Sequence, residues 1–115
     1  MNYDIKKQLI SFGDLPDGWH YGTGGSIPRE RIASALEWNE WLVQHGWTDT
    51  FAFPGESKEI MLSSLKDSTC LDIILEIDDT FTVIYEEKDK EDIYIDKLTE
   101  EDAKATCISL VNIRN

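Results

Sequence analysis

The chain has 115 residues, of which 41% are hydrophobic and 10% aromatic, so it can bury one core, and the sequence predicts a single domain over residues 1–115. Its 23 acidic residues outnumber 11 basic ones, which gives a net charge of −12. This balance argues against a nucleic-acid-binding protein or a protein of anionic membrane surfaces, because both bind through clustered lysine and arginine. We find no apolar stretch long enough for a membrane span, and residues 1–4 do not begin a signal peptide.

The first dozen residues predict a short helix, with Leu9 and Phe12 on one side and Gly13 as its stop. Residues 15–18 carry the turn signal Leu-Pro-Asp-Gly, which leads into a glycine-rich loop over residues 19–26. A second helix is expected from Pro28 to about His45, where Gly46 ends it.

The second helix has one apolar side. At about 100° per residue, its core face should hold Ile32, Ala35, Leu36, Asn39, Leu42 and Val43. Trp41 projects nearly opposite this face, and it is flanked there by Trp38 and His45. The helix therefore predicts tryptophans on its outward side.

After residue 55 the hydrophobic period changes to two, which predicts strands over residues 60–64, 71–77 and 81–85 and a shorter fourth strand over 93–95. A two-residue turn at Asp67-Ser68 places Leu62 opposite Ile73. A three-residue loop over residues 78–80 is expected to pair Ile77 with Phe81. The core face then holds Ile60, Leu62, Leu71, Ile73, Leu75, Ile77, Phe81, Val83 and Tyr85.

Residues 99–102, Thr-Glu-Glu-Asp, predict the start of a closing helix, because the acids lie on its positive end. The expected fold class is α+β. It has two N-terminal helices, a three- to four-stranded antiparallel meander and a C-terminal helix, in the order α-α-β-β-β-β-α.

The other side of the predicted sheet is also apolar. Met61, Ile74 and Ile84 form a row there, which Leu65 and Cys70 extend. An apolar row is expected to be buried under another part of the structure, and a terminal helix of the same chain is the favoured candidate. A partner chain is the alternative, which leaves self-association open.

The expected register also places Asp72 opposite Glu86, with Glu76 two residues further along the strand. Paired carboxylates can act as acid and base, or bind hard cations. In a chain with 23 acids, a solvated strand face is the favoured interpretation.

The sequence predicts no enzyme, no cofactor and no metal site. His20 and His45 have no nucleophile nearby in sequence, and the glycine-rich loop lacks the lysine of a phosphate cradle. Cys70 and Cys107 are not in a Cys-x-x-Cys spacing, so reduced, buried thiols and a cytoplasmic, bacterial location are expected.

Leu15-Pro16-Asp17-Gly18-Trp19 and Gly22-x-Gly24, a helix, and then Phe53-Pro54-Gly55 before Ile60-x-Leu62 resemble a loose group of small uncharacterised bacterial proteins. These proteins carry a DGW…GxG loop, a helix, a (Y/F)P turn, an antiparallel meander and a closing helix. The likeness spans residues 13–77, although Ser63-Ser64 stand where the group often has Glu-Trp. It implies the fold and a bacterial origin, and it implies no activity.

The function that we expect is a non-enzymatic acidic binding protein, such as an immunity protein or antitoxin that neutralises a basic protein. Residues 58–115 hold fifteen acids and seven bases, and such a field steers a cationic partner. The alternative is a small-molecule or metal-binding domain, or an enzyme, that uses the aromatic glycine-rich loop. Trp19, Tyr21, Trp38 and Trp41 are expected to form one aromatic region. The interface candidates are Trp38, Trp41, His45, Trp19, Tyr21, Asp72, Glu76 and Glu86.

Overall fold

The computed structural model describes residues 4–114 of the chain, and its side chains over residues 4–111. The fold is α+β, as predicted, with three helices, a short 3₁₀ turn and five strands in the described part. In chain order these are α1 (Ile5–Ser11), η1 (Phe12–Asp14), α2 (Arg29–Gln44), β1 (Asp49–Pro54), β2 (Ile60–Lys66), β3 (Thr69–Leu75), β4 (Phe81–Glu87), β5 (Ile93–Leu98) and α3 (Glu100–Arg114).

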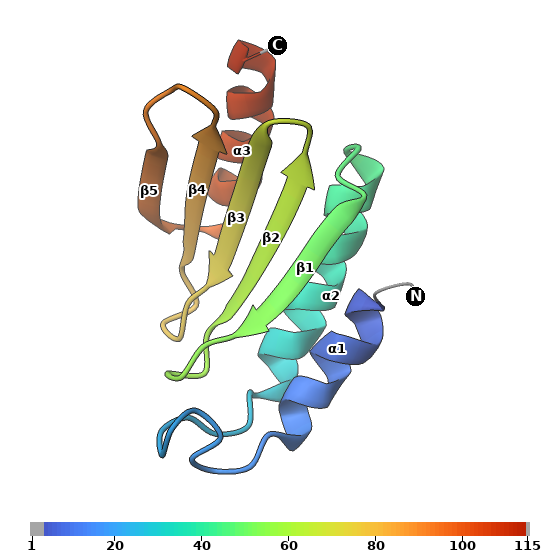
Figure 1. Cartoon of the computed structure of the whole chain (residues 1–115), viewed down its shortest axis with the longest axis vertical. Coiled ribbons are helices and arrows are strands. Elements are labelled where there is room, and N and C mark those ends of the chain that lie inside the picture. The colour runs from blue at the N-terminus through green and yellow to red at the C-terminus, as the bar shows by residue number, and fades with distance from the viewer. Residues whose placement is uncertain (1–3, 115) are drawn as a thin grey trace.

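The five strands form one antiparallel sheet in the order β1-β2-β3-β4-β5 (Figure 1). The expected count of three to four strands is therefore too low, and the missing strand is β1. The residue pattern of β1 does not predict a strand, because the small residues Thr50 and Ala52 point into the core while Phe51 and Phe53 point outward. Alternation in hydropathy, the usual strand signal, is thus inverted in β1.

The two central hairpins agree with the predicted registers to different degrees. Leu62 pairs with Ile73 across β2 and β3, as predicted. Between β3 and β4 the predicted register is wrong by two residues, because Leu75, and not Ile77, pairs with Phe81. A shift of two residues keeps every side chain on its predicted side of the sheet, but it leaves Ile77 outside the strands and 59% exposed.

The shift arises in the β3–β4 turn. The backbone N–H of Glu76 donates to the carbonyl of Thr80 at 3.0 Å, so the three-residue loop starts one residue earlier than predicted. The Asp78 carboxylate accepts hydrogen bonds from the Thr80 hydroxyl at 2.6 Å and from its backbone N–H at 3.1 Å. Asp79 adopts a φ of +65°, a conformation that aspartate tolerates in turns. Local aspartate chemistry therefore sets the register.

This register gives a matched pair of substitutions. Leu75→Ala should lower the free energy of unfolding by about 2–5 kcal/mol, as truncation of a buried leucine does, because Leu75 is only 3% exposed. Ile77→Ala should change it by less than about 0.5 kcal/mol, as an exposed substitution does. Urea unfolding of both variants measures the two values. Equal losses would contradict the register.

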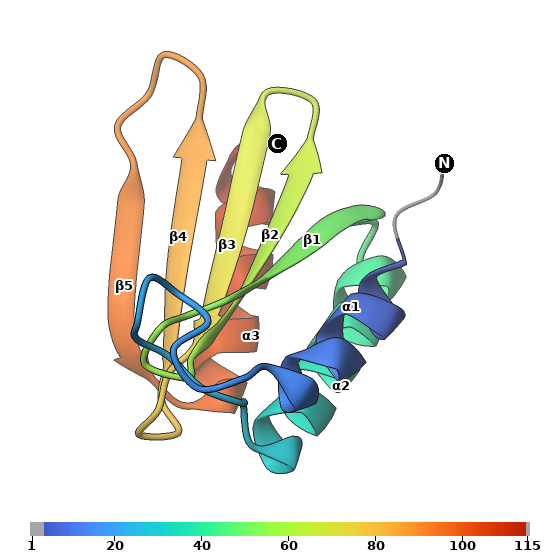
Figure 2. The ribbon, with the colours of Figure 1, turned by 60° about the horizontal axis from the view of Figure 1, so that its bottom comes forward.

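Helices α2 and α3 lie on one side of the sheet, behind it in Figure 1, whereas α1 lies beside α2 at the β1 edge, as Figure 2 also shows. Helix α1 contacts β1, and α2 contacts β2. Helix α3 contacts β4 and β5. The expectation that a terminal helix covers the reverse face is thus wrong, because α3 puts Ala103, Cys107 and Leu110 into the same core as Val83. The other side of the sheet carries no helix within residues 4–114.

Helix α2 buries a stripe that differs from the predicted one. Ile32, Ala35, Asn39 and Leu42 are buried as predicted, but Val43 is 46% exposed. Trp38, expected on the outward side, is fully buried, and its ring centroid lies 5.5 Å from that of Phe81. The Lys104 ammonium of α3 lies 5.3 Å from the centre of the Trp38 ring, so α3 covers this side of α2. A single helix considered alone does not reveal that second neighbour.

Candidate functional site

The side of the sheet that faces away from the helices is the candidate site, and we call it the open face. Alternation along the paired strands assigns to it Asp49, Phe51, Phe53, Met61, Ser63, Leu65, Cys70, Asp72, Ile74, Thr82, Ile84, Glu86 and Tyr94. The viewer of Figure 1 looks onto this face. The strands present it as a rigid platform, because each of them is hydrogen-bonded in one continuous sheet.

The open face is strongly apolar and accessible. Phe53 and Leu65 are each 47% exposed, and Tyr94 is 62% exposed. Met61 and Ile74 lie opposite each other, Ile84 lies opposite Asp72, and all three apolar side chains are half-buried. Apolar surface that is contiguous and exposed marks interaction sites in folded proteins.

The charged groups of the open face are acidic. Asp49, Asp72 and Glu86 lie on it, and no lysine or arginine occupies an open-face position of β1 to β4. Lys97, in β5, is a nearby cation, and its ammonium is bound to the Asp78 carboxylate at 3.2 Å. That interaction raises the pKa of Lys97, while the Thr80 hydroxyl and N–H lower the pKa of Asp78 to about 2.

Asp72 has an unusual place in the open face. Only 9% of it is exposed, and it lies between Ser63 and Ile84 on the neighbouring strands. The Cys70 thiol donates a hydrogen bond to its Oδ1 at 3.3 Å, and burial raises the pKa of that thiol. A thiol is a weak donor, and no described lysine, arginine or histidine lies within ion-pair distance of Asp72. Within the described residues, the Asp72 carboxylate therefore has no cationic partner.

The expected carboxylate cluster is not formed. Ile84, and not Glu86, is opposite Asp72, because the β3–β4 register differs from the predicted one, and Glu86 lies opposite Cys70. Glu76 lies beyond the end of β3, and its Oε2 accepts a hydrogen bond from the Thr82 hydroxyl at 2.7 Å. The arrangement does not provide the paired acid and base of a hydrolytic site.

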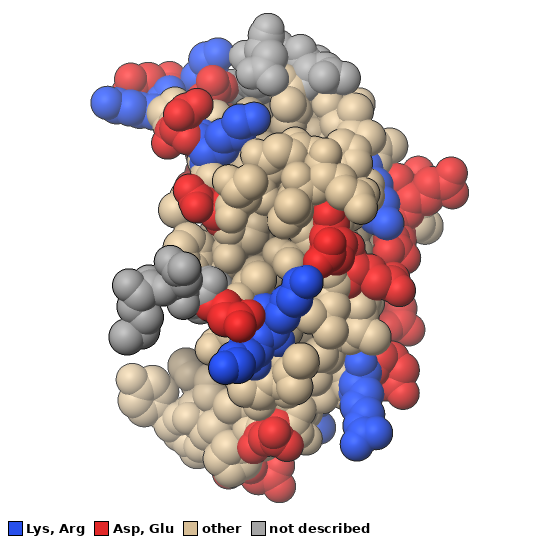
Figure 3. Space-filling model, turned by 90° about the vertical axis from the view of Figure 1, so that its right-hand side faces the viewer, with Lys and Arg blue, Asp and Glu red and all other residues tan. Residues whose placement is uncertain are grey.

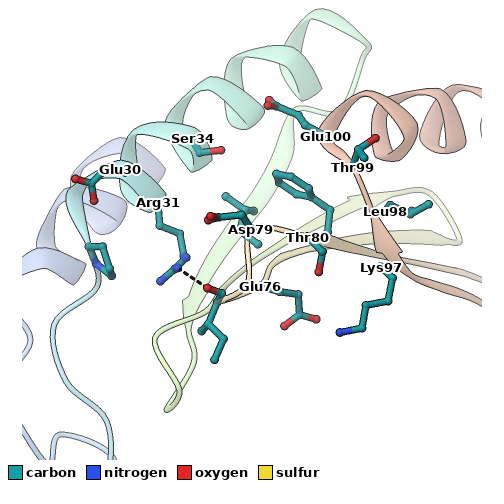
Figure 4. A pocket seen from close by; sticks show the side chains of 14 residues that line it. Glu30, Arg31, Ser34, Glu76, Asp79, Thr80, Lys97, Leu98, Thr99 and Glu100 are labelled. Carbon is teal, nitrogen blue, oxygen red and sulfur yellow. Dashed lines mark hydrogen bonds between the residues drawn. The ribbon is translucent and has the colours of Figure 1, made fainter.

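The largest cavity, about 660 Å³, lies at one end of the sheet, between the start of α2, the β3–β4 turn and the β5–α3 junction (Figure 4). Arg31 lines this cavity, and its guanidinium hydrogen-bonds to backbone carbonyls. It donates to the carbonyl of Lys58 at 2.7 Å and to that of Ile77 at 3.5 Å. Thr99 also has a structural role here, because its hydroxyl accepts from the backbone N–H of Asp102 at the start of α3. The polar groups of the cavity thus hold turns and helix ends in place.

The glycine-rich loop is filled by its own tryptophan. The Trp19 indole N–H donates to the carbonyl of Gly25 at 3.1 Å, and a Cβ on Gly24 would lie 2.6 Å from that nitrogen. His20 contacts both neighbouring rings and lies 3.6 Å from the Glu56 carboxylate. The Trp19 indole therefore packs directly against the loop backbone at Gly24 and Gly25.

The predicted aromatic region is two separate groups. Trp19 and Tyr21 contact His20 in the loop, whereas Trp41 contacts Trp38 and stacks on His45 with ring centroids 4.1 Å apart. The second group lies on the helix side, away from the open face. Trp38 is inaccessible there, so it cannot be a direct anchor for a partner.

Neither histidine belongs to a metal or catalytic cluster in the described chain. The Nδ1 of His45 lies 2.8 Å from the Trp41 carbonyl, at the end of α2, whereas His20 is in the loop. No group of three or more metal-ligating side chains occurs among residues that the structure describes. Cys107 is buried in the core, which raises its pKa to about 12 and keeps its thiol protonated.

Comparison with known proteins gave no match to any family model, curated protein or solved structure. The resemblance of the DGW loop and the Phe-Pro turn to small bacterial proteins therefore stays a prediction. Within the described residues, no helix has the length and apolar character that crossing a membrane requires.

Sequence reasoning identified part of the open face. It placed Met61, Ile74 and Ile84 on this face, and Met61 does pair with Ile74, but the predicted row is wrong at Ile84, because the two-residue shift between β3 and β4 puts Thr82 opposite Ile74 and Asp72 opposite Ile84. It did not identify Phe51 and Phe53, because their strand was not recognised, or Tyr94, because the fourth predicted strand was short. The useful signal was the alternation of aromatic and small residues over 49–54, which marks a strand whose large side chains face away from the core.

Proposed function

We propose that this protein is a non-enzymatic binding domain that holds a basic protein on its open face. The observation that carries the proposal is an exposed, apolar sheet face that carries carboxylates and has no helix over it in the described chain. A protein that neutralises a basic toxin or nuclease, as immunity proteins and antitoxins do, would need such a surface. This interface replaces the one expected around Trp38 and Trp41.

The apolar part of the face would supply most of the affinity. Phe51, Phe53 and Tyr94 present large rings on a rigid sheet, so they lose little conformational freedom when a partner covers them. The half-buried Met61 and Ile74 lie between them and would be fully desolvated in a complex. This arrangement fits the usual anatomy of an interface, in which an apolar centre is surrounded by polar groups.

The charge of the protein supports a cationic partner. Acidic side chains also run along the helix side, at the right of Figure 3, so the field of the whole molecule attracts positive charge. Long-range attraction accelerates the encounter with a cationic partner, but it does not determine which face of the protein binds that partner. Asp72 would determine which face binds, because a largely buried carboxylate that accepts a hydrogen bond from a thiol gains from a stronger, charged donor such as a lysine or arginine of the partner.

Site-specific photocrosslinking in cells that make the protein tests the proposal. A benzoylphenylalanine at position 94, on the open face, should form an adduct with another protein that contains more Lys and Arg than Asp and Glu. The same residue at position 10 is the matched control, because Ile10 is 59% exposed but belongs to α1 and not to the sheet. Mass spectrometry of the adducts identifies the partner.

Three results would contradict the proposal. They are equal adducts from positions 94 and 10, an adduct with an acidic protein, and the absence of any adduct at position 94. An adduct between two copies of this chain would likewise contradict it, and would show instead that the open face is a homodimer interface.

A further inference from the structure

The tip of the glycine-rich loop is a small, preformed hairpin. The backbone N–H of His20 donates to the carbonyl of Thr23 at 2.8 Å, and the N–H of Thr23 donates back at 2.9 Å. Tyr21 and Gly22 form the two-residue turn between them, and both have positive φ, +51° and +94°. Turns of this kind favour Asn-Gly, because both central residues must be left-handed.

Several bonds hold this hairpin rigidly. At its base, the N–H of Gly18 donates to the carbonyl of Gly24 at 2.9 Å, beside the Trp19 indole bond to Gly25. The Thr23 hydroxyl lies 3.1 Å from the Glu56 carboxylate, in the turn between β1 and β2. The tip is therefore tied to the β1–β2 turn by hydrogen bonds that do not involve the Tyr21 side chain, whose ring contacts only the neighbouring His20 ring among the described aromatic pairs.

Tyr21 is unusual at such a tip. It is 97% exposed, and its backbone has a left-handed conformation that bulky residues rarely adopt. Asparagine or glycine would form the same turn with less strain. Backbone strain that the fold does not need is a feature of functional positions, so the exposed ring is the property that requires an explanation.

The hairpin lies on the same side of the sheet as the open face. In Figure 1 the loop of residues 15–27 lies below the strands, and in Figure 2, with the bottom brought forward, it lies across the lower ends of β3 to β5. The two views together place the loop in front of the sheet, on its open side. A partner seated on the open face would therefore meet the hairpin tip.

We infer that Tyr21 is a second anchor for the same partner, and that its ring enters an apolar recess on that basic protein. The inference rests on the proposed function and adds to it a contact on a different element from the open face. A rigid tip presents the ring without an entropic penalty from the loop, and tyrosine is enriched among residues that dominate interface affinity.

Crosslinking from position 21 tests the inference beside the open-face position 94. Benzoylphenylalanine at position 21 should form an adduct with the same basic protein that position 94 captures. An adduct at 94 without one at 21 would overturn the role of Tyr21 and leave the proposed function standing. An adduct at 21 with a different protein would also overturn it. The absence of adducts at both positions would overturn both proposals.

Two substitutions then separate the role of the ring from a structural role, with the captured protein purified as the probe. Tyr21→Asn removes the ring and relieves the strained turn, so the dissociation rate should rise about tenfold or more while the melting temperature is unchanged or higher. Tyr21→Phe keeps the ring and should change that rate less than about threefold. An unchanged dissociation rate for Tyr21→Asn would overturn the inference.

Discussion

Replacing Trp38 by alanine should lower the free energy of unfolding by about 3–5 kcal/mol, the range for large aromatic side chains in cores. Trp38 is fully buried and fills the space between α2, β4 and α3, where it contacts Phe81, Trp41 and Lys104. A small domain has a stability of about 5–15 kcal/mol, so this one change should remove a large part of it. Denaturant unfolding followed by circular dichroism measures the loss.

The matched control is Trp38→Phe. The Trp38 indole nitrogen is buried without a hydrogen-bond partner in the described structure, so phenylalanine removes no bond and relieves an unsatisfied donor. We expect it to lose less than about half as much stability as the alanine variant, because most of the ring contacts remain. A loss below about 1 kcal/mol for Trp38→Ala would show that the ring is not part of the core.

Replacing Asp72 by arginine should weaken binding of the basic partner about 100-fold or more, which corresponds to about 2.7 kcal/mol. The substitution removes the carboxylate at the centre of the open face and places a like charge against a cationic surface. Asp72→Asn, which keeps the shape, should give a smaller loss that appears mainly in the dissociation rate. Surface plasmon resonance with the purified partner measures both constants.

Glu37→Arg is the control for net charge. Glu37 is exposed on α2, on the helix side, and its reversal changes the total charge by the same amount as Asp72→Arg. It should reduce the association rate only modestly, and this reduction should disappear at high salt, because exposed charges act through the screened field. Equal losses from the two variants would show that the charge of the whole molecule, and not Asp72, determines affinity.

Residue patterns predicted the fold class, the β2–β3 register and the core face of the sheet, because alternation in these strands coincides with burial. Leu62 and Ile73, for example, are apolar and fully buried. Strand β1 was not predicted, because its buried positions are Thr50 and Ala52. Helix α1 packs against this strand, and a neighbour distant in sequence is not visible in the pattern of the strand alone.

The same limit explains the errors at the candidate site. Trp38 was placed outward because the periodicity of one helix identifies one packed face, whereas α2 packs on the sheet and beside α3. The open face was expected to have a cover, because an apolar row favours burial. Hydropathy shows that Met61 and Ile74 should be buried, but it does not show whether their cover belongs to the same chain.

The order of the elements along the chain also has a consequence for how the protein forms during synthesis. Helices α1 and α2 are made first, yet Leu9, Phe12 and Leu42 are buried in a core that includes strands made later. Three further core residues, Ala103, Cys107 and Leu110, belong to α3, which is made after all five strands. The N-terminal half therefore cannot complete its packing while the chain is growing. Each strand, by contrast, pairs with its immediate predecessor, so little loop entropy opposes the sheet once the helices are present. Folding of this domain should therefore follow closely once α3 has been synthesised.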